Sequence, residues 1–323
     1  MIVAARIAPI PRARYAGAMI LARETRLATA IVIAIGVLYG LYWMPVRQIA
    51  EMGLPGAWGT FAITLTGSLL LLPRILRRTD AVRAADPMAL TAVALGGAAF
   101  ALYSIGFVYG RVAMIILLWF LTPIWSTLIT RFILGWPTTR LRLWAIFAGL
   151  AGLLVMLGAG GQVPLPRGIG EWMALLAGMI WAVSTTGVRL RPEVEPITAG
   201  FIFTLGAALT SLALAPLLAP WPDLGAIANP AALIPVAIGT GALWWGTAMA
   251  ALMWAAARLD PARVGILLMA EVLIGTATAA LWAGETLSFA EILGGALVLV
   301  AAVLEIWPTR RANGAGGADG STS

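Results

Sequence analysis

Long apolar stretches, separated by short polar segments, follow one another along almost the whole sequence. A stretch of about 20 apolar residues is long enough to cross a bilayer as a helix. Ten such stretches are present, and none of the segments between them is long enough for a soluble domain. They cover residues 27–46, 54–73, 88–109, 112–130, 141–159, 171–188, 197–219, 232–256, 262–283 and 287–307. The pattern predicts an all-α polytopic membrane protein with ten transmembrane helices.

The composition supports this class. The chain has 323 residues, of which 61% are hydrophobic and 11% charged, whereas a soluble domain is about half apolar and a quarter charged. One aqueous core cannot bury so much apolar surface. The lipid bilayer is therefore the first partner that the sequence predicts.

Three residue types are missing altogether. The chain has no Cys, no His and no Lys. Disulfides, Cys or His metal sites and a histidine general base are therefore excluded. The phosphate-binding loop of ATP-driven proteins is also excluded, because it needs a Lys. We expect no metal, no cofactor and no hydrolysis of ATP.

The arginines predict the topology. All 21 basic residues are Arg, and the formal charge is +7. If the N-terminus lies inside, 18 arginines fall in cytoplasmic segments and only Arg47, Arg111 and Arg167 fall outside, as the positive-inside rule requires. The positive charge therefore indicates orientation in a bacterial inner membrane, with both termini cytoplasmic, and no nucleic-acid partner.

The chain divides into two helical halves with tails. The N-terminal segment lacks the cleavage site of a signal peptide, so we interpret it as a tail. The C-terminal segment is rich in Gly and Ser, which predicts disorder. The predicted order is a cytoplasmic tail (1–26), a first five-helix half (27–159), a linker (160–170), a second five-helix half (171–307) and a disordered cytoplasmic tail (308–323).

An odd number of spans in each half means that the second half enters the membrane from the opposite side, as in inverted repeats of transporters. Two ungapped matches support the repeat. GVLYGLYWMPVR matches GMIWAVSTTGVR, which aligns Gly36 with Gly178. LTPIWSTLITRFILGW matches AEVLIGTATAALWAGE, which aligns Thr122 with Glu271. The sequence therefore predicts two inverted five-helix repeats.

These features resemble the EamA-type, ten-helix family of the drug/metabolite transporter superfamily. The second half carries the resemblance best, with Glu271, then the pair Gly284-Glu285, then LSFAEILGGALVLVAAVL. Two departures weaken roles carried over from the family: Val272 stands where Pro is common, and Trp136 stands where the first half would have a turn Glu. The resemblance implies a basket of helices around a central cavity, lined mainly by spans 1, 3, 4, 6, 8 and 9.

Within that superfamily, LLWFLTPIWSTLITRF and LLAGMIWAVSTTGVR resemble the YddG-type exporters of aromatic amino acids. The cavity-lining spans contain aromatic and hydroxyl side chains that suit an amphiphilic substrate. Helix packing, lipid contact and interfacial belts are the alternative roles of such aromatics. The candidate substrate path consists of Tyr39, Tyr42, Trp43, Tyr103, Trp119, Thr122, Trp181, Ser184, Thr185, Trp244 and Trp245.

Glycine and proline mark candidate hinges. Gly36 and Gly40 have the spacing that allows close helix approach, and Pro45 and Pro123 can break a span and free carbonyl groups. Static packing is the alternative interpretation for each of them.

Glu271 is the one acid predicted near the membrane midplane, where a charge is costly. Three roles remain open for it. It can be a protonated structural residue, it can bind a substrate ammonium group, or it can carry a coupling proton.

The sequence predicts an exporter of amino acids, aromatic ones among them, that works by alternating access as a uniporter or a proton-coupled carrier. An exporter of hydrophobic cations is the alternative within the same class. An intramembrane enzyme is disfavoured because no two acids share one depth in neighbouring spans, and a scaffold without transport is a further alternative. The sequence leaves the oligomeric state open.

Overall fold

The structure is a computed structural model, and it describes residues 12–306 apart from 137–138, 159–164, 224, 226, 228, 257 and 260. The predicted C-terminal tail and residues 160–164 of the predicted linker lie outside the described residues. Every regular element within the described part is a helix. The prediction of an all-α architecture is confirmed.

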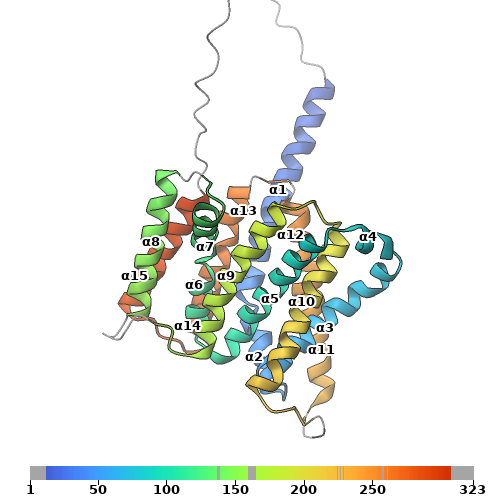
Figure 1. The fold of residues 1–323 in the computed structure, drawn as a ribbon, viewed down its shortest axis with the longest axis vertical. Helices are drawn as coiled ribbons and strands as arrows, with labels where there is room; N and C mark the ends of the chain where they lie inside the picture. Colours follow the sequence, from blue (N-terminus) through green and yellow to red (C-terminus); the bar gives the residue numbers. More distant parts are fainter. Residues whose placement is uncertain are drawn as a thin grey trace, which may run out of the picture.

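The first half contains α1 to α8 and one π-helical stretch (Figure 1). Its elements are α1 (Arg12–Gly40), α2 (Trp43–Glu51), α3 (Ala57–Leu76), α4 (Thr79–Ala84), α5 (Pro87–Tyr109), α6 (Val112–Trp119), α7 (Thr122–Leu128), η1 (Ile129–Ile133) and α8 (Arg140–Leu157). Helix α1 begins inside the segment predicted as a tail. Its N-terminal turns extend beyond the rest of the bundle in Figure 1.

The second half repeats this layout. Its elements are α9 (Ile169–Arg189), α10 (Pro196–Leu218), α11 (Pro230–Thr240), η2 (Gly241–Ala248), α12 (Met249–Ala256), α13 (Pro261–Leu268), α14 (Ala270–Trp282) and α15 (Phe289–Ile306). Among the described residues, nine helical segments are long and apolar enough to cross a membrane, and Phe289–Leu304 is a shorter apolar helix. The ten predicted spans correspond to these nine segments and this shorter helix.

The helix pairs follow the symmetry that an inverted repeat requires. Helices α8 and α15, the last of each half, pack against each other at one side of the bundle, and α3 packs against α10 (Figure 1). Each of these pairs joins equivalent helices. Helix α5 packs against α9, and the equivalent pair, α12 and α1, is also in contact. The spans therefore interlock across the two halves, so neither half has a core that is separate from the other.

The aligned glycines Gly36 and Gly178 make equivalent contacts. A Cβ atom built on Gly36 would lie 3.3 Å from the carbonyl oxygen of Leu267, and one on Gly178 would lie 3.5 Å from that of Leu118. Leu118 and Leu267 are themselves aligned by the second sequence match. Two matches that were found independently in the sequence thus meet in space, which supports the repeat.

The two Gly turns are equivalent as well. Gly135 has a φ of 69° and Gly284 a φ of 64°, a region that glycine adopts at little cost. The amide of Trp136 donates to the carbonyl of Thr130 at 3.0 Å, and that of Glu285 donates to Ala279 at 3.1 Å. Both bonds span six residues, one more than the closing bond of a Schellman motif.

Candidate functional site

Three spans are broken near their middles. In span 1, α1 ends at Gly40 and α2 begins at Trp43. Pro45 has no N–H to offer the carbonyl of Leu41, which instead accepts from the amide of Met44 at 3.1 Å. The missing donor explains why the helix is interrupted here. Pro45 therefore lies at a real break, and its role as a hinge stays a prediction.

Span 4 breaks at Phe120 and Leu121, directly before Thr122 and Pro123. Pro123 leaves the carbonyl of Trp119 without its helical donor. The hydroxyl of Thr122 takes over and donates to that carbonyl at 2.7 Å. Thr122 therefore has a local structural partner, although we predicted it for the substrate path from its position in span 4.

Span 9 breaks at the aligned position without a proline. Helix α13 ends at Leu268 and α14 begins at Ala270. The amide of Val272 donates to Met269 at 3.0 Å, one residue short of the helical register. Glu271 consequently lies in the first turn of α14, where the helix dipole favours a negative charge. This break was not predicted from the sequence.

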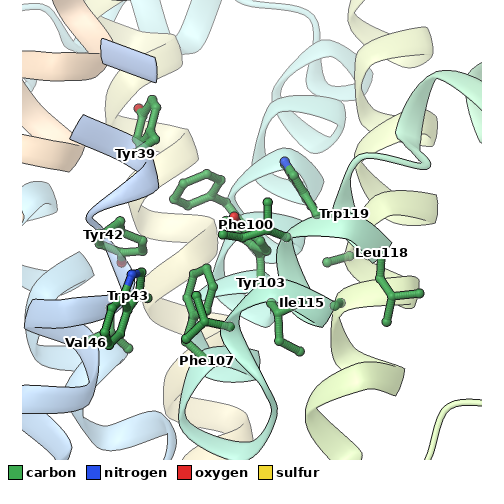
Figure 2. Packing of buried hydrophobic residues seen from close by; sticks show 14 of the residues in the cluster. Tyr39, Tyr42, Trp43, Val46, Phe100, Tyr103, Phe107, Ile115, Leu118 and Trp119 are labelled. Carbon is green, nitrogen blue, oxygen red and sulfur yellow. The ribbon is translucent and has the colours of Figure 1, made fainter. Parts of the chain in front are cut away.

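Ten aromatic rings from spans of both halves meet between these breaks, and we call them the aromatic cluster. Phe100 of α5 lies at its centre and contacts rings of α1, α6, α10 and η2 as well as its own neighbour Tyr103. Figure 2 shows Phe100 with Tyr103 and Phe107 between Tyr39 and Tyr42 on one side and Trp119 on the other. The cluster consists of Tyr39, Tyr42, Phe100, Tyr103, Phe107, Trp119, Trp181, Phe203, Trp244 and Trp245.

The rings pack in edge-to-face, tilted and stacked arrangements. Tyr103 stacks on Trp119 with the ring centroids 4.7 Å apart and the planes at 24°, and Trp119 contacts Trp181 at 5.3 Å. Offset and edge-to-face pairs of this kind add about 0.5–1.5 kcal/mol each beyond area burial. The cluster is buried apart from Trp181 and Trp244, which are half-buried. Lipid contact therefore does not explain most of these side chains.

A chain of hydrogen bonds links the cluster to its neighbours. The indole N–H of Trp245 donates to the hydroxyl of Tyr42 at 3.0 Å. That hydroxyl is 2.9 Å from the hydroxyl of Ser104, which in turn is 3.0 Å from that of Thr60. All four residues are buried, so each polar tip needs the partner that it has.

Two further indoles bind across spans. The N–H of Trp43 donates to the hydroxyl of Thr278 on α14 at 3.1 Å. The N–H of Trp244, in the π-helical stretch η2, donates to the carbonyl of Leu38 beside the span 1 break at 2.8 Å. Trp43 lies outside the aromatic cluster as defined by ring contacts, although it packs in the same core.

Glu271 lies in this core. Its side chain is buried, with 7% of its surface exposed, and the hydroxyl of Tyr103 donates to its Oε1 at 2.7 Å. Among the described residues, no basic side chain forms an ion pair with it. The hydroxyl of Tyr39 is also buried and has no hydrogen-bond partner among the described residues.

The remaining candidates lie at the edge of this arrangement. Ser184 is buried on α9 and faces Gly96 of α5. Thr185 donates to the carbonyl of Trp181 in its own helix at 2.9 Å. Gly36 and Gly40 let α1 approach α14 closely, since a Cβ on Gly40 would lie 2.9 Å from the carbonyl oxygen of Glu271. These glycines therefore have a packing role that the structure accounts for.

Three rings of the cluster were missed by sequence reasoning: Phe100, Phe107 and Phe203. A Phe in an apolar span has no polar tip that requires a partner, so the sequence carries no signal for it. Phe203 belongs to span 7, which was not predicted to line the cavity. Only the helix packing brings these rings to the centre.

The end of the bundle with few arginines, here the Arg-poor end, carries a network of charges. Glu285 accepts from the amides of Val112 and Ala113 at the start of α6, at 2.7 and 3.1 Å. Its carboxylate is 3.3 Å from the guanidinium of Arg47, which also donates to the carbonyl of Phe107. Glu285 therefore joins the end of span 1 to the turn between spans 3 and 4.

A second ion pair stands beside it. Arg111, in the turn before α6, donates to both carboxylate oxygens of Glu291 at 2.6 and 3.2 Å. The Glu291 carboxylate raises the pKa of Arg111 above its usual value. Glu291 also accepts from the amide of Ser288 at 2.8 Å, so the first turn of α15 is fixed to the turn between spans 3 and 4.

The comparisons with known proteins agree with this architecture. Residues 168–307 match the EamA-like transporter family. A solved structure titled only "Crystal structure of protein" is 21% identical, with 84% of this chain and 95% of the other chain covered and a TM-score of 0.52, and this likeness shows the fold alone. No curated protein sequence matches the chain. The predicted family is therefore supported by the second half of the chain.

Proposed function

Because residues 168–307 match the EamA-like transporter family, we propose that this chain is a multi-pass membrane transporter that exports amino acids, aromatic ones among them. The export runs across the bacterial inner membrane by alternating access, with both termini in the cytoplasm. The family is one of transporters, so the intramembrane enzyme is set aside. The observation that carries the proposal is the aromatic cluster, which both halves build between three broken spans.

The cluster suits an aromatic amphiphile for a physical reason. Aromatic faces stack on an aromatic ring and attract a cation, whereas a phosphorylated substrate needs Arg or Lys beside its path. The arginines with described ion pairs, Arg47, Arg78, Arg111, Arg191 and Arg258, all lie near helix ends. The lining therefore favours uncharged rings and small polar groups over multiply charged anions.

The broken spans supply the moving parts. Discontinuous helices near the midplane are where secondary transporters bind substrate and coupling ions. In this conformation the cluster rings are packed together, with Phe100 only 8% exposed, so a substrate can enter only when the rings separate. Rocking of the two halves about the breaks at Gly40, Leu121 and Met269 would separate them towards one side at a time.

Reconstituted transport tests this proposal. Purified protein in liposomes is loaded with unlabelled phenylalanine, and counterflow of labelled phenylalanine is measured with and without a pH gradient. Counterflow that is saturable and competed by tryptophan and tyrosine is the expected result. Counterflow of a labelled quaternary ammonium compound without that of any amino acid would instead establish the alternative, an exporter of hydrophobic cations.

A further inference from the structure

Glu271 lacks a counter-charge within the described protein. Its carboxyl group is buried and receives one hydrogen bond from Tyr103, but no described basic residue forms an ion pair with it. A buried carboxylate is costly unless it is paired and hydrogen-bonded. A proton on the carboxyl group, or a cationic group of a ligand, would balance this charge.

The hydroxyl of Tyr39 is a second polar group of this core that lacks a partner among the described residues. Tyr39 is only 6% exposed. Gly36 and Gly40, on either side of Tyr39 in the sequence, bring α1 against the first turn of α14, which carries Glu271. A buried polar group without a partner is unusual in a native structure. A ligand that donates a hydrogen bond to this hydroxyl would give it the partner that it lacks.

The walls around these polar groups are aromatic. The ring of Tyr103 stacks on Trp119 and meets Phe100 edge-on, with centroids 5.6 Å apart. Phe100 also contacts Tyr39 at 5.8 Å. Ring faces attract an ammonium group by about 0.5–2 kcal/mol, and they hold an apolar or aromatic substituent by burial and stacking.

We propose that Glu271 and the hydroxyls of Tyr39 and Tyr103 bind the primary ammonium group of the substrate, while the aromatic cluster holds its apolar or aromatic part. This inference rests on the proposed transport function and names the recognised group. A primary ammonium has three N–H donors, enough for the Glu271 carboxylate and the Tyr39 hydroxyl. A quaternary ammonium has none, so it would leave both groups without a hydrogen bond.

Among the described residues, no arginine lies over a ring of the aromatic cluster where it could bind a substrate carboxylate. The aromatic cluster contains no basic side chain. Arg47, over the ring of Trp43, is already engaged with the carbonyls of Phe107 and Gly110 and with Glu285. The ammonium group is therefore the required feature of the substrate and its carboxylate is dispensable. Aromatic amines without a carboxylate belong to the same substrate class as aromatic amino acids.

Competition for labelled phenylalanine counterflow tests this proposal with three unlabelled probes. Phenethylamine keeps the ring and the ammonium, N-acetylphenylalanine keeps the ring and the carboxylate, and phenyltrimethylammonium keeps the ring and a charge without N–H groups. Phenethylamine is expected to compete about as well as phenylalanine. The other two are expected to compete at least about tenfold more weakly, because each loses at least one charge-assisted hydrogen bond to the site.

Variants separate recognition from folding. Glu271→Gln keeps the shape of the side chain, and Tyr39→Phe removes only the unpartnered hydroxyl. Both are expected to weaken the apparent affinity for phenethylamine, Glu271→Gln by about tenfold or more. The matched controls are Glu171→Gln, a buried acid in the first turn of α9, and Tyr109→Phe, which lies outside the aromatic cluster and whose hydroxyl donates to the carbonyl of Leu218. Elution as a monodisperse peak shows that each variant is folded.

The outcomes are distinct. Equal competition by N-acetylphenylalanine, unchanged affinity in the folded Glu271→Gln variant, or no effect of phenethylamine at millimolar concentration would each overturn the ammonium site. If no amino acid is transported, binding is read as ligand-induced thermal stabilisation of the purified protein. Stabilisation by phenethylamine that Glu271→Gln removes would then support the ammonium site even though the proposed function has failed.

Discussion

The breaks in spans 4 and 9 stand at aligned positions of the two halves, but they differ in chemistry. The first is followed by Thr122 and Pro123, and the hydroxyl of Thr122 satisfies the carbonyl that the proline leaves free. The second is followed by Glu271, which reaches out of its helix to Tyr103. At the break in span 4 the side chain bonds within its own span, whereas at the break in span 9 an acid contacts the aromatic cluster.

The turns that end these spans differ in the same way. Trp136 follows Gly135, and Glu285 follows Gly284, in turns of equivalent backbone geometry. Glu285 accepts from two amides at the start of α6 and approaches Arg47. The aligned start of α13 is Pro261, which has no N–H to offer. The two halves of the inverted repeat therefore share their backbone geometry at the break and at the turn. Only the second half carries a carboxylate at these two positions.

The largest effect is expected at the two breaks. Glu271→Gln should lower transport of aromatic amines and amino acids at least about tenfold. If Glu271 also carries a coupling proton, the remaining transport should no longer depend on a pH gradient. Thr122→Val should leave both properties unchanged, because the Thr122 hydroxyl bonds within its own span. Initial rates in liposomes measure both, and equal losses in the two variants would contradict the division of roles.

The next effect concerns two glycines of the matched spans 1 and 6, Gly40 and Gly178, which are not aligned with each other. A Cβ on Gly40 would lie 2.9 Å from the backbone nitrogen of Gly275, whereas one on Gly178 would have its nearest described neighbours at 3.4 Å. Gly40→Ala should therefore destabilise the protein by about 1–3 kcal/mol, as overpacking does. Gly178→Ala should be nearly neutral. Thermal unfolding in detergent gives the comparison, and a tolerated Gly40→Ala would show that α1 and α14 can separate at little cost.

The ion pair of Glu285 comes third. Glu285→Gln removes a charge that pairs with Arg47 and accepts two amide donors, which should cost about 1–3 kcal/mol. The substitution leaves Glu271 intact, so the affinity for the substrate should not change. A single Cys introduced near Trp43, in a chain that has none of its own, should become more accessible to a thiol reagent from the Arg-poor side. If labelling and stability were unaltered, the ion pair between Glu285 and Arg47 would not hold the Arg-poor end closed.

A smaller and symmetrical effect is expected at the two turn glycines. Gly135 and Gly284 both have positive φ, and an added Cβ would meet nothing within 4 Å at either position. Alanine at each should therefore cost only backbone strain, about 1–2 kcal/mol. Thermal unfolding should give the same shift for Gly135→Ala and Gly284→Ala. Clearly unequal shifts would mean that the two turns are not equivalent in energy.

The smallest effect is expected at the Arg-rich end, in the pair of Arg78 and Glu195. Burial tends to raise the pKa of Glu195, but hydrogen bonds from Thr198 and the nearby Arg78 lower it below about 4.5 overall. A depressed folded-state pKa contributes stability above the unfolded-state value, and this contribution is lost as the pH falls through the folded-state value. An exposed pair is worth about 0.2–1 kcal/mol.

Glu195→Gln should therefore change the melting temperature slightly near pH 7 and flatten its decline below about pH 4.5. Melting curves from pH 3 to pH 7 are compared with those of Glu285→Gln. If Glu195→Gln proved more destabilising than Glu285→Gln, the Arg-poor end would not be the more strongly fixed end of the bundle.

Much of the fold was predictable, because span length and hydropathy decide how a chain crosses a bilayer. The class and the number of spans, within one short helix, were confirmed, and the family is supported by the match over residues 168–307. The positions of the Gly turns were also implied by the aligned Gly135 and Gly284. The amino-acid substrate, the orientation and the site residues stay predictions.

The candidate site was predictable only in part. Polar-tipped aromatics such as Tyr42 and Trp245 were found because a buried hydroxyl or indole needs a partner. Phe100 was missed although it is central, since nothing distinguishes one Phe in an apolar span from another. The break at Met269 was missed because no proline announces it, and the partner of Glu271, Tyr103, lies 168 residues away.

By itself, the sequence determined the membrane class, the ten apolar spans, the inverted repeat and the exclusion of Cys and His chemistry. These follow from composition and from patterns that are local along the chain. Only the tertiary structure decided which rings meet, that Glu271 faces Tyr103 rather than lipid, and that Glu285 rather than Trp136 caps a helix. Such contacts depend on the relative rotation of packed helices, and hydropathy does not encode that rotation when a span is apolar on all sides.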